Sequence, residues 1–278
     1  MPRFIISLLL CSLVSACATS PTGRKQLMMV DSDQIAPAAA KSFTEMKQQE
    51  RLEKDKAVNR YVHCVIDPLI VEATADYEFL PPNWDIAVFN SDSVNAFAMP
   101  GGKVGVYTAL LQLAETPDQL AAVMGHEIGH VIARHSAERM STAQLTVIGM
   151  TLAGIATANN EQQSIIMAAL GMGAYVGVQL PFSRTHETEA DDIGQRLMAK
   201  AGFDPAHAVR LWQLMAGNGK TPPELLSTHP DPNNRAERLR ENLGKMRPLY
   251  LQAKAAGKNP QCNKPVIPKT VKPAEKAG

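Results

Sequence analysis

The spacing of apolar positions predicts a chain that is mostly helical. Between residues 34 and 61, apolar side chains recur among charged ones at the spacing of an amphipathic helix. Thr116-Pro117-Asp118-Gln119 combines a capping box with proline at the first helical position, so a helix should begin there and run through His135. Two further capped helices are expected over residues 204–217 and 231–244.

Three short stretches are typical of β-strands. Residues 84–89 and 103–107 are rich in β-branched or aromatic side chains, and residues 94–99 form a third candidate. Pro100-Gly101-Gly102 separates the last two stretches and is a hairpin signal. The predicted fold class is therefore α+β, mostly helical with a small three-stranded sheet.

Residues 140–181 are predicted to form an apolar helical hairpin. Its two pieces, residues 145–157 and 165–180, are dense in glycine, alanine and methionine. Each falls short of the roughly 20 residues that a membrane-spanning helix needs. Two interpretations stay open: a mobile hairpin that covers a functional site or touches lipid, and a buried hairpin of the core.

The N-terminus is typical of an export signal. A positive charge precedes an apolar run at residues 4–14, which is too short to span a bilayer. The run ends in Leu13-Val14-Ser15-Ala16-Cys17, which resembles a bacterial lipobox, so residues 1–16 are predicted to be a lipoprotein signal peptide and Cys17 to be lipidated. The alternative is an ordinary signal peptide cut after Ala18. Alanine after the cysteine resembles outer-membrane sorting, which predicts a lipid-anchored protein at the outer membrane, facing the periplasm.

The remaining cysteines and the chain ends complete the predicted organisation. Cys64 and Cys262 are expected to form a disulfide in an oxidising compartment, with two unrelated buried thiols as the alternative. Residues 17–35 are predicted to be a membrane-proximal linker and residues 36–250 the folded domain. Residues 251–278 are predicted to be a Lys/Pro-rich tail, disordered beyond Cys262.

Composition excludes one class of function. The chain has 28 basic and 27 acidic residues, a net charge of +1, and no basic stretch interleaved with aromatic residues. Nucleic-acid binding usually requires a strongly basic face, so no nucleic-acid partner is expected.

The sequence Gly-His-Glu-Ile-Gly-His at residues 125–130 is the strongest chemical signal. Inside a helix, His126 and His130 lie one turn apart on one face, close enough to bind one metal ion. Glu127 lies about 100° round the helix, which suits a general base that holds the attacking water. Without a metal, the two histidines would be an exposed polar face. Small residues leave room for close packing on this helix: Gly125, Gly129 and Ala133.

An acidic stretch at residues 187–191 offers the third ligand. A catalytic zinc takes three protein ligands and keeps one open position. On a helix, Glu187 and Asp191 share a face, so Glu187 is the predicted ligand and Asp191 is expected to hydrogen-bond a ligand histidine. Glu189 points nearly the opposite way and is interpreted as a solvated acid. His186 is a rival ligand that the same helix turns aside.

His126-Glu127-x-x-His130 with Glu187-x-x-x-Asp191 resembles the HtpX-like zinc metallopeptidases, the family that also holds the CAAX prenyl endopeptidase. The chain is most similar to the periplasmic lipoprotein members of the BepA and LoiP type. The resemblance extends from about residue 25 to 245, and three further matches contribute to it: Asn95-Ala96-Phe97-Ala98, Thr228-His229-Pro230 and Arg235. It implies a zincin-like fold with one Zn²⁺ per chain and a sheet edge that lines the active-site cleft.

The resemblance also implies roles for residues outside the two motifs. Asn95, Ala96, Phe97 and Ala98 would form an edge strand that binds an extended peptide by main-chain pairing. His229 would lie near the zinc, either as a donor to the oxyanion of the tetrahedral intermediate or as a fourth ligand; otherwise it is a loop histidine without a role. Arg235 is expected to support Asp191 or Glu187. Some histidines fit no motif and are interpreted as surface or core residues: His63, His135 and His207.

The predicted function is that of a gluzincin-type zinc endopeptidase of the bacterial cell envelope, which hydrolyses peptide bonds in unfolded or misassembled envelope proteins. Glu127 would take the proton of the attacking water and pass it to the leaving amine. The expected partners are such polypeptides, the outer membrane through the lipid anchor, and outer-membrane assembly machinery. The alternative is a chaperone-like assembly factor with a latent zinc site that seldom cuts.

Overall fold

The computed structural model describes residues 17–158, 164, 180–217, 225, 229 and 232–268. The predicted signal peptide, much of the second piece of the predicted apolar hairpin, and residues 269–278 lie outside these ranges. The described helices are α2 (Ser32–Gln49), α3 (Lys56–Asp76), α4 (Thr108–Leu113), α5 (Pro117–Ile132), α6 (His135–Ala156), α8 (Leu180–Lys200), α9 (Ala206–Gly217) and α11 (Pro232–Ala255). The described strands are β1 (Cys17–Thr19), β2 (Lys25–Leu27), β3 (Asp85–Phe89), β4 (Ala96–Met99) and β5 (Lys103–Tyr107).

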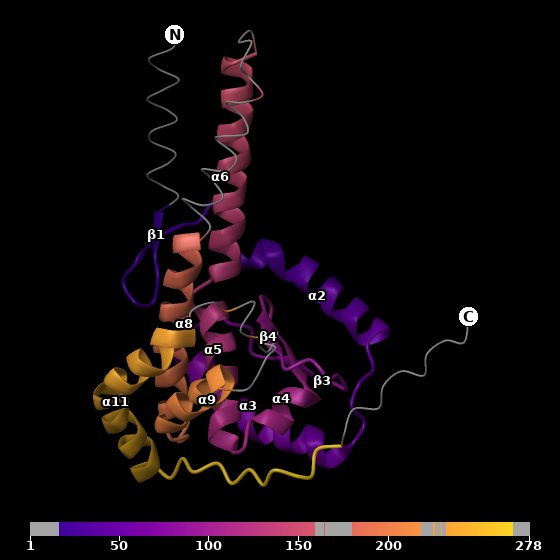
Figure 1. Ribbon diagram of the computed structural model, residues 1–278, viewed down its shortest axis with the longest axis vertical. Coiled ribbons are helices and arrows are strands. Elements are labelled where there is room, and N and C mark those ends of the chain that lie inside the picture. Colours follow the sequence, from indigo (N-terminus) through magenta and orange to yellow (C-terminus); the bar gives the residue numbers. More distant parts are fainter. Residues whose placement is uncertain are drawn as a thin grey trace, which may run out of the picture.

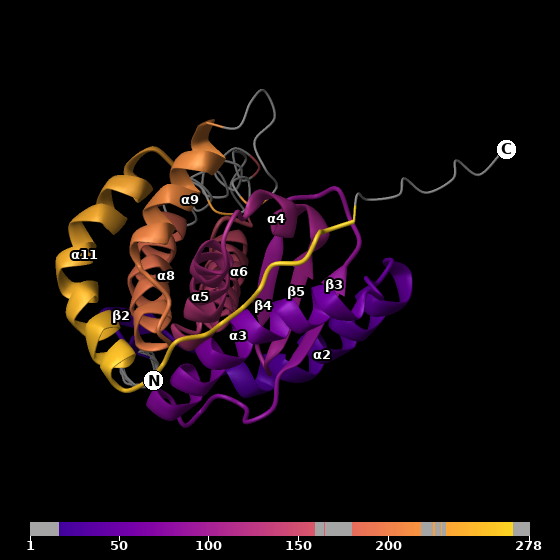
Figure 2. The same cartoon turned by 90° about the horizontal axis from the view of Figure 1, so that it is seen from below.

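The α+β, mostly helical zincin-like fold is confirmed (Figure 1). The three predicted strands form one sheet in the order β3-β5-β4, with β3 parallel and β4 antiparallel to β5. Gly101 and Gly102 both take positive φ angles, 78° and 68°, so the tight turn between β4 and β5 needs glycine at these positions. β4 is an edge strand of this sheet and is the strand that contacts α5 (Figure 2).

Helix α5 is the centre of the fold because it is buried from Gln119 to Ile132. Thr116 caps it by accepting a hydrogen bond from the Gln119 backbone, with Pro117 in the first turn, as the sequence predicts. The helix ends at Ile132, before the predicted end at His135. Arg134 adopts a left-handed conformation (φ 55°, ψ 33°), which breaks the helix and starts α6 in a new direction.

Two other helix predictions need correction. The segment predicted as one amphipathic helix is two helices, α2 and α3, separated by an extended stretch that contains a bridge from Leu52 to Phe89. Helix α9 matches its prediction. Helix α11 continues past Gly244 to Ala255, because a glycine inside a helix weakens it by only about 1 kcal/mol and does not end it when neighbouring turns pack.

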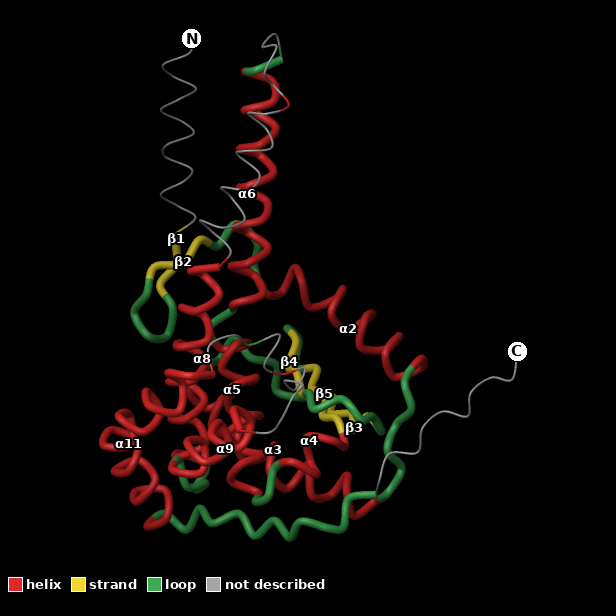
Figure 3. The backbone as a smooth tube through the Cα atoms, in the orientation of Figure 1, coloured by secondary structure: helices red, strands yellow, loops and turns green. Residues whose placement is uncertain are grey.

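The predicted linker at residues 17–35 is ordered. Cys17, the predicted lipidation site, begins β1, which pairs antiparallel with β2 and forms a small hairpin at residues 17–27. Asp31 then caps α2 in a capping box with Gln34. In Figures 1 and 3 the hairpin lies at the base of α6, beside the start of α8.

The tail also differs from its prediction. Cys64 and Cys262 form a disulfide across 198 positions of the sequence, which typically stabilises a fold by about 2–5 kcal/mol. Beyond it the chain stays packed: Lys264 Nζ donates to the Ala114 carbonyl at 2.7 Å, and Ile267 packs against the core. In Figure 2 this extended segment runs across α3. A disulfide and local packing therefore hold a segment whose composition is typical of disorder.

Helix α6, the described part of the predicted apolar hairpin, projects from the body of the molecule (Figures 1 and 3). It exposes apolar side chains that include Val147, Leu152 and Ile155, the last with 69% of its surface accessible. This part of the hairpin is therefore not buried in the core. Among the described helices, none has the length and apolar character required to cross a membrane.

Candidate metal centre

Four side chains from three parts of the chain converge beside α5. His126 and His130 lie on α5, Glu187 on α8, and His229 shortly before α11. His126 Nε2 lies 3.0 Å from His130 Nε2 and 3.2 Å from His229 Nδ1. The Glu187 oxygens lie 3.0 Å from His229 Nδ1, 3.3 Å from His126 Nε2 and 3.4 Å from His130 Nε2. The structure therefore brings the three predicted ligands together and adds His229.

The spacing of these donor atoms fits a small tetrahedral metal ion. Zinc binds imidazole nitrogen and carboxylate oxygen at about 2.0–2.2 Å, which separates the corners of a tetrahedron by roughly 3.3–3.6 Å. The observed separations of 3.0–3.4 Å are close to this value. Imidazole and carboxylate are also donors that zinc prefers. The residues present therefore fit the metal that the motifs predict.

Glycines explain how α8 delivers its carboxylate to α5. A Cβ added to Gly125 would lie 2.8 Å from the Gly194 carbonyl oxygen, and one added to Gly129 would lie 2.8 Å from the Ala190 carbonyl oxygen. The two helices therefore pack backbone against backbone, closer than larger side chains permit. This crossing places Glu187 and Asp191 directly over the two histidines of α5.

Glu127 lies beside the four donors without joining them. It is buried, with 3% of its surface accessible, and its Oε1 lies 3.5 Å from His229 Nε2. Within the described part of the chain, Glu127 Oε1 has no hydrogen-bond partner. A buried carboxylate oxygen normally accepts a hydrogen bond, so this atom is placed to accept one from a bound water or substrate.

Asp191 and Arg235 hold the His126 ring from behind. His126 Nδ1 lies 3.0 Å from Asp191 Oδ1, which also accepts from Arg235 Nε at 2.8 Å. The Arg235 guanidinium stacks on Trp212, 3.4 Å from the ring centre, contacts the His126 ring, and donates from Nη1 to Glu187 at 3.4 Å. Asp191 therefore lies where the sequence predicts it, and Arg235 contacts both carboxylates that were proposed for it.

Burial and charge set the protonation of this cluster. Burial raises the pKa of Glu187, but hydrogen bonds from His126, His130 and His229 bring that pKa well below its usual range. Burial and Arg235 lower the pKa of His126, but hydrogen bonds to Asp191 and Glu187 raise it to about 9. Burial lowers the pKa of His130 well below its usual range. Glu187 is therefore an anion among the imidazoles, and it supplies the negative charge of the donor set.

A second buried cluster lies behind His130, where the sequence predicts none. His130 Nδ1 lies 2.8 Å from His135 Nδ1, and His135 Nε2 lies 3.1 Å from Glu189 Oε2. Glu189 is buried, with 4% of its surface accessible, so its interpretation as a solvated acid is wrong. The reason is that the N-terminal hairpin covers this face of α8: Arg24 Nη2 donates to Glu189 at 2.7 Å.

The remaining described histidines lie outside the set of metal donors. His186 does turn away from the metal donors; it is buried, donates to Glu138 at 3.1 Å and stacks on His135 with ring centres 4.1 Å apart. His63 is exposed beside Asp67, and His207 contacts Thr116. Burial lowers the pKa of His135 to about 4. Of the three histidines without a motif, His135 is the one that contacts a metal donor.

The predicted substrate-binding strand is β4 with the preceding Asn95. The Phe97 side chain is partly buried and packs with Phe43, Phe89 and Tyr107. The outer backbone edge of β4 has no strand partner in the described ranges. At its start, the Val94 carbonyl accepts a hydrogen bond at 3.2 Å from the backbone of Leu225, whose own carbonyl accepts one from His229.

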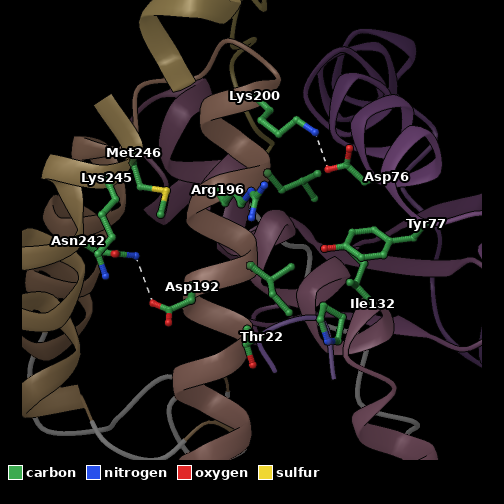
Figure 4. Close-up of a pocket in the computed structure, with 13 residues that line it drawn as sticks. Thr22, Asp76, Tyr77, Ile132, Asp192, Arg196, Lys200, Asn242, Lys245 and Met246 are labelled. Carbon is green, nitrogen blue, oxygen red and sulfur yellow. Dashed lines mark hydrogen bonds and ion pairs between the residues drawn. The ribbon is translucent and has the colours of Figure 1, made fainter. Parts of the chain in front are cut away.

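The metal donors do not line the pocket beside α8 and α11. A pocket of about 330 Å³ lies between α8, α11 and the end of α3, with Thr22, Tyr77 and Arg196 among its walls (Figure 4). Lys200 pairs with Asp76 and Asp192 accepts from Asn242 at its rim. None of the four donor residues lines this pocket, so it carries no evidence about the metal chemistry.

The sequence pattern of a known family spans the fold and the site just described. A model of Peptidase family M48 matches residues 56–243, from the start of α3 into α11. The chain belongs to peptidase family M48. The metallopeptidase resemblance drawn from the two motifs is thereby confirmed.

Individual M48 relatives match a large part of the chain. Mitochondrial metalloendopeptidase OMA1 of Saccharomyces cerevisiae is 34% identical over 180 residues, 61% of this chain and 50% of that protein. The β-barrel assembly-enhancing protease of Escherichia coli is 38% identical over 175 residues, 60% of this chain and 36% of that protein. Metalloendopeptidase OMA1 of Bos taurus is 33% identical over 240 residues, 78% of this chain and 44% of that protein. The chain spans half or less of the length of these curated relatives.

The relatives correct one prediction. The sequence predicts a lipid-anchored protein at the outer membrane, facing the periplasm. Two of the three relatives named above are mitochondrial metalloendopeptidases, which contradicts that location as an inference from the family. The lipobox, the alanine that follows it and the resemblance to periplasmic lipoproteins had suggested it, and it is withdrawn.

Proposed function

We propose that this M48 protein is a zinc-dependent endopeptidase that hydrolyses peptide bonds in unfolded or misassembled proteins. The observation that carries the proposal is the buried donor set of His126, His130 and Glu187 with the unpartnered Glu127 Oε1 beside it. The metalloendopeptidase names of the relatives support the reaction. The name of the Escherichia coli relative supports substrates drawn from protein assembly.

Each residue has a role in the proposed reaction. When bound by His126, His130 and Glu187, zinc supplies Lewis acidity for attack on the scissile carbonyl. Glu127 accepts the proton of the attacking water at Oε1 and gives it to the leaving amine. Asp191 accepts from His126 Nδ1 and so fixes which nitrogen faces the metal. Arg235 keeps Asp191 ionised, because burial raises the pKa of that carboxyl and the guanidinium lowers it.

The substrate would bind as an extended strand along β4. Its outer backbone edge can pair with an added strand, and such pairing depends on the main chain more than on side chains. Because Phe97 packs inward, recognition would depend little on side-chain identity. A chain that must be extended to bind must also be unfolded locally, which favours unfolded substrates.

A second candidate function, a chaperone-like factor with a latent site, is favoured by the placement of His229. Its Nδ1 lies with the metal donors, in the position that an open catalytic site reserves for water or substrate. Leu225, whose carbonyl accepts a hydrogen bond from the His229 backbone, itself donates to Val94 at the start of the proposed substrate edge. The contact between Leu225 and Val94 would therefore have to break before a peptide could bind there.

The decisive experiment compares wild-type protein with Glu127→Gln. Elemental analysis should find one zinc per chain in both, because Glu127 is not among the donors. The wild type should cleave unfolded casein, lose cleavage with a chelator and regain it with zinc, whereas Glu127→Gln should bind zinc without cleaving. Cleavage by Glu127→Gln, or wild-type protein that binds no transition metal, would refute the proposal.

His229→Ala separates the two candidate functions. If His229 closes the site, the variant should keep zinc and cleave casein faster than the wild type. If His229 donates to the transition state, the variant should lose about 10²–10³-fold in kcat, the effect of removing one oxyanion donor. An unchanged kcat would exclude both roles.

A further inference from the structure

We propose that the N-terminal hairpin, residues 17–27, is part of the metal centre, with Arg24, Glu189 and His135 as residues that position His130. The hairpin lies outside the segment that matches the M48 family, which begins at residue 56. The inference rests on the proposed function in one respect, because it takes His130 as a metal ligand.

The first step is the contact between two imidazoles. His130 Nε2 faces the other donors, so a metal-binding His130 carries its proton on Nδ1. That Nδ1 lies 2.8 Å from His135 Nδ1, so His130 donates and His135 accepts. His135 then carries its own proton on Nε2 and donates it to Glu189 Oε2 at 3.1 Å. Metal binding at His130 Nε2 therefore fixes which atom donates in each hydrogen bond from His130 to His135 and from His135 to Glu189.

The second step is the break between α5 and α6. Five residues along one continuous helix correspond to about 140° of rotation, which would turn His135 away from His130. The left-handed Arg134 redirects the chain so that the two rings meet with centres 4.9 Å apart. His135 and His130 therefore meet because the helix is interrupted between them.

The third step anchors the network in the hairpin. Arg24 donates from Nε and Nη2 to Glu189 at 3.0 and 2.7 Å, and from Nη1 and Nη2 to Glu138 at 2.7 Å each. Glu138 and Glu189 side chains are 0% and 3% exposed. Two buried carboxylates would repel each other strongly without a cation between them, so Arg24 is the residue that lets both stay ionised. Thr22 adds a hydrogen bond to Glu189.

This cluster is not a second metal site. His135, Glu138 and His186 have donor atoms close enough to hold an ion. Both Glu138 oxygens already accept from Arg24, and Oε2 also accepts from Gln26 at 2.8 Å and from His186 at 3.1 Å. A metal ion would have to displace the guanidinium or lie next to its positive charge. Arg24 supplies the cation that the two carboxylates require.

Polar contacts attach the hairpin to the domain. Gln26 Nε2 donates to the Ala133 carbonyl at 2.7 Å, at the break after α5. Ser20 and Gln26 are among the buried polar residues, and the main core cluster takes no member from residues 17–27. The contacts of Arg24 and Gln26 therefore attach the hairpin to the domain, and the same hairpin supplies the cation of the charged network. If the hairpin raises metal affinity, thermodynamic reciprocity requires that the metal stabilises the hairpin.

Three substitutions in the full chain test the inference. His135→Phe keeps a ring beside His186 but removes the acceptor for His130, whereas His135→Asn keeps an acceptor there. Arg24→Gln removes the cation. Lys25→Gln is its matched control, because Lys25 is adjacent and exposed, and its side chain donates to Thr19 instead of to the buried carboxylates. Circular dichroism and thermal unfolding establish that each variant is folded.

The readout is zinc affinity, measured by competition with a chromogenic chelator, together with the visible spectrum of the Co²⁺-loaded protein. Loss of a partner behind a ligand histidine typically weakens metal binding about 10–100-fold. We expect this loss for His135→Phe, a smaller loss of roughly tenfold for Arg24→Gln, recovery in His135→Asn, and wild-type values for Lys25→Gln. The Co²⁺ spectrum should shift in His135→Phe. Folded His135→Phe and Arg24→Gln proteins with wild-type affinity and spectrum would overturn the inference.

A measurement on wild-type protein covers the case in which a variant fails to fold. Amide hydrogen exchange in residues 18–27 should slow when zinc is added, and exchange in α2 should not change. Equal exchange in the hairpin with and without zinc would overturn the inference. Failure of the proposed function looks different: wild-type protein would bind no metal, or Glu127→Gln would still cleave.

Discussion

The two histidines of α5 are held from behind in different ways. His126 contacts Asp191 directly, and Asp191 is paired with Arg235, an arrangement named here the short arm. His130 contacts His135, which contacts Glu189, which is paired with Arg24; this is the long arm. Both arms end in an arginine, since each buried carboxylate needs a cation to remain ionised.

The arms differ in where the arginine comes from. Arg235 is buried and stacked on Trp212 at the centre of the α8–α9–α11 packing. The side chain of Arg24 is 21% exposed and belongs to a hairpin attached by polar contacts. The short arm is therefore part of the core, and breaking it should destabilise the whole domain. The long arm depends on the hairpin, so we expect substitutions there to lower metal affinity while the domain stays folded.

The largest expected effect comes from breaking the short arm with Asp191→Ala. Removing this carboxylate leaves the Arg235 guanidinium buried without its closest anion, which should lower the free energy of unfolding by about 3–5 kcal/mol. Zinc affinity should fall about 10–100-fold. Urea denaturation and chelator competition measure both. Asp192 is an exposed neighbour, and the control variant Asp192→Asn should change neither the stability nor the zinc affinity. A loss below about 1 kcal/mol in Asp191→Ala would contradict the role of the Asp191–Arg235 pair.

The next effect is a loss of stability at low pH, when the Glu138 carboxylate beside the long arm is protonated. Burial raises the pKa of Glu138, but hydrogen bonds from Arg24, His186 and Gln26 lower it from 4.5 to about 2. A folded pKa below the unfolded one contributes stability above pH 4.5, and that contribution is lost as pH falls towards 2. At about 1.4 kcal/mol per pKa unit, the contribution is at most about 3.5 kcal/mol.

Denaturation of wild type and Glu138→Gln between pH 7 and pH 2 measures this contribution. The wild type should be more stable above about pH 5, and the two curves should converge as pH approaches 2. Glu45→Gln removes an exposed glutamate that pairs weakly with Lys41 and should follow the wild type throughout. A constant gap between wild type and Glu138→Gln would show that the carboxylate charge is not what stabilises the arm.

A smaller loss should follow from Gly194→Ala, which disturbs both arms at once. The added Cβ would lie 2.6 Å from the Gly125 carbonyl carbon and from the His126 backbone nitrogen. Backbone atoms cannot move aside as side chains do, so α8 must shift, at a loss of about 1–3 kcal/mol. The thermal unfolding temperature and the zinc affinity should both decrease. Gly149→Ala on the projecting helix is the control: its Cβ meets open space, and it should stabilise the protein slightly. A Gly194→Ala variant as stable as the wild type would refute the close crossing.

The smallest effect is expected at the break between the helices. Arg134→Gly relieves a left-handed conformation that costs a larger residue about 1–2 kcal/mol, but loses the guanidinium contact with Phe79, worth about 0.5–1 kcal/mol. The net change in unfolding free energy should be within about 1 kcal/mol, and zinc affinity should not change. Valine disfavours this left-handed conformation further, so Arg134→Val should lower both the free energy of unfolding and the zinc affinity. Equal behaviour of the two variants would mean that the break does not position His135.

Much of the site follows from helical periodicity alone. His126 and His130 are four residues apart, as are Glu187 and Asp191, and in a helix such pairs share a face whatever surrounds them. The capping box at Thr116 and the glycines after Pro100 likewise specify local structure. These predictions depend on residues that are neighbours in sequence, and each reappears in the fold.

Tertiary structure decided the surroundings of those faces. Periodicity correctly turns Glu189 away from Glu187, but whether that direction meets water or another segment depends on the hairpin at residues 17–27, which no local pattern connects to α8. His135 contacts His130 because one residue between them, Arg134, takes a left-handed conformation. His229 joins the donors from more than a hundred positions beyond His126. A sequence pattern determines which side of a helix a residue occupies, and only packing between distant segments determines what that side faces.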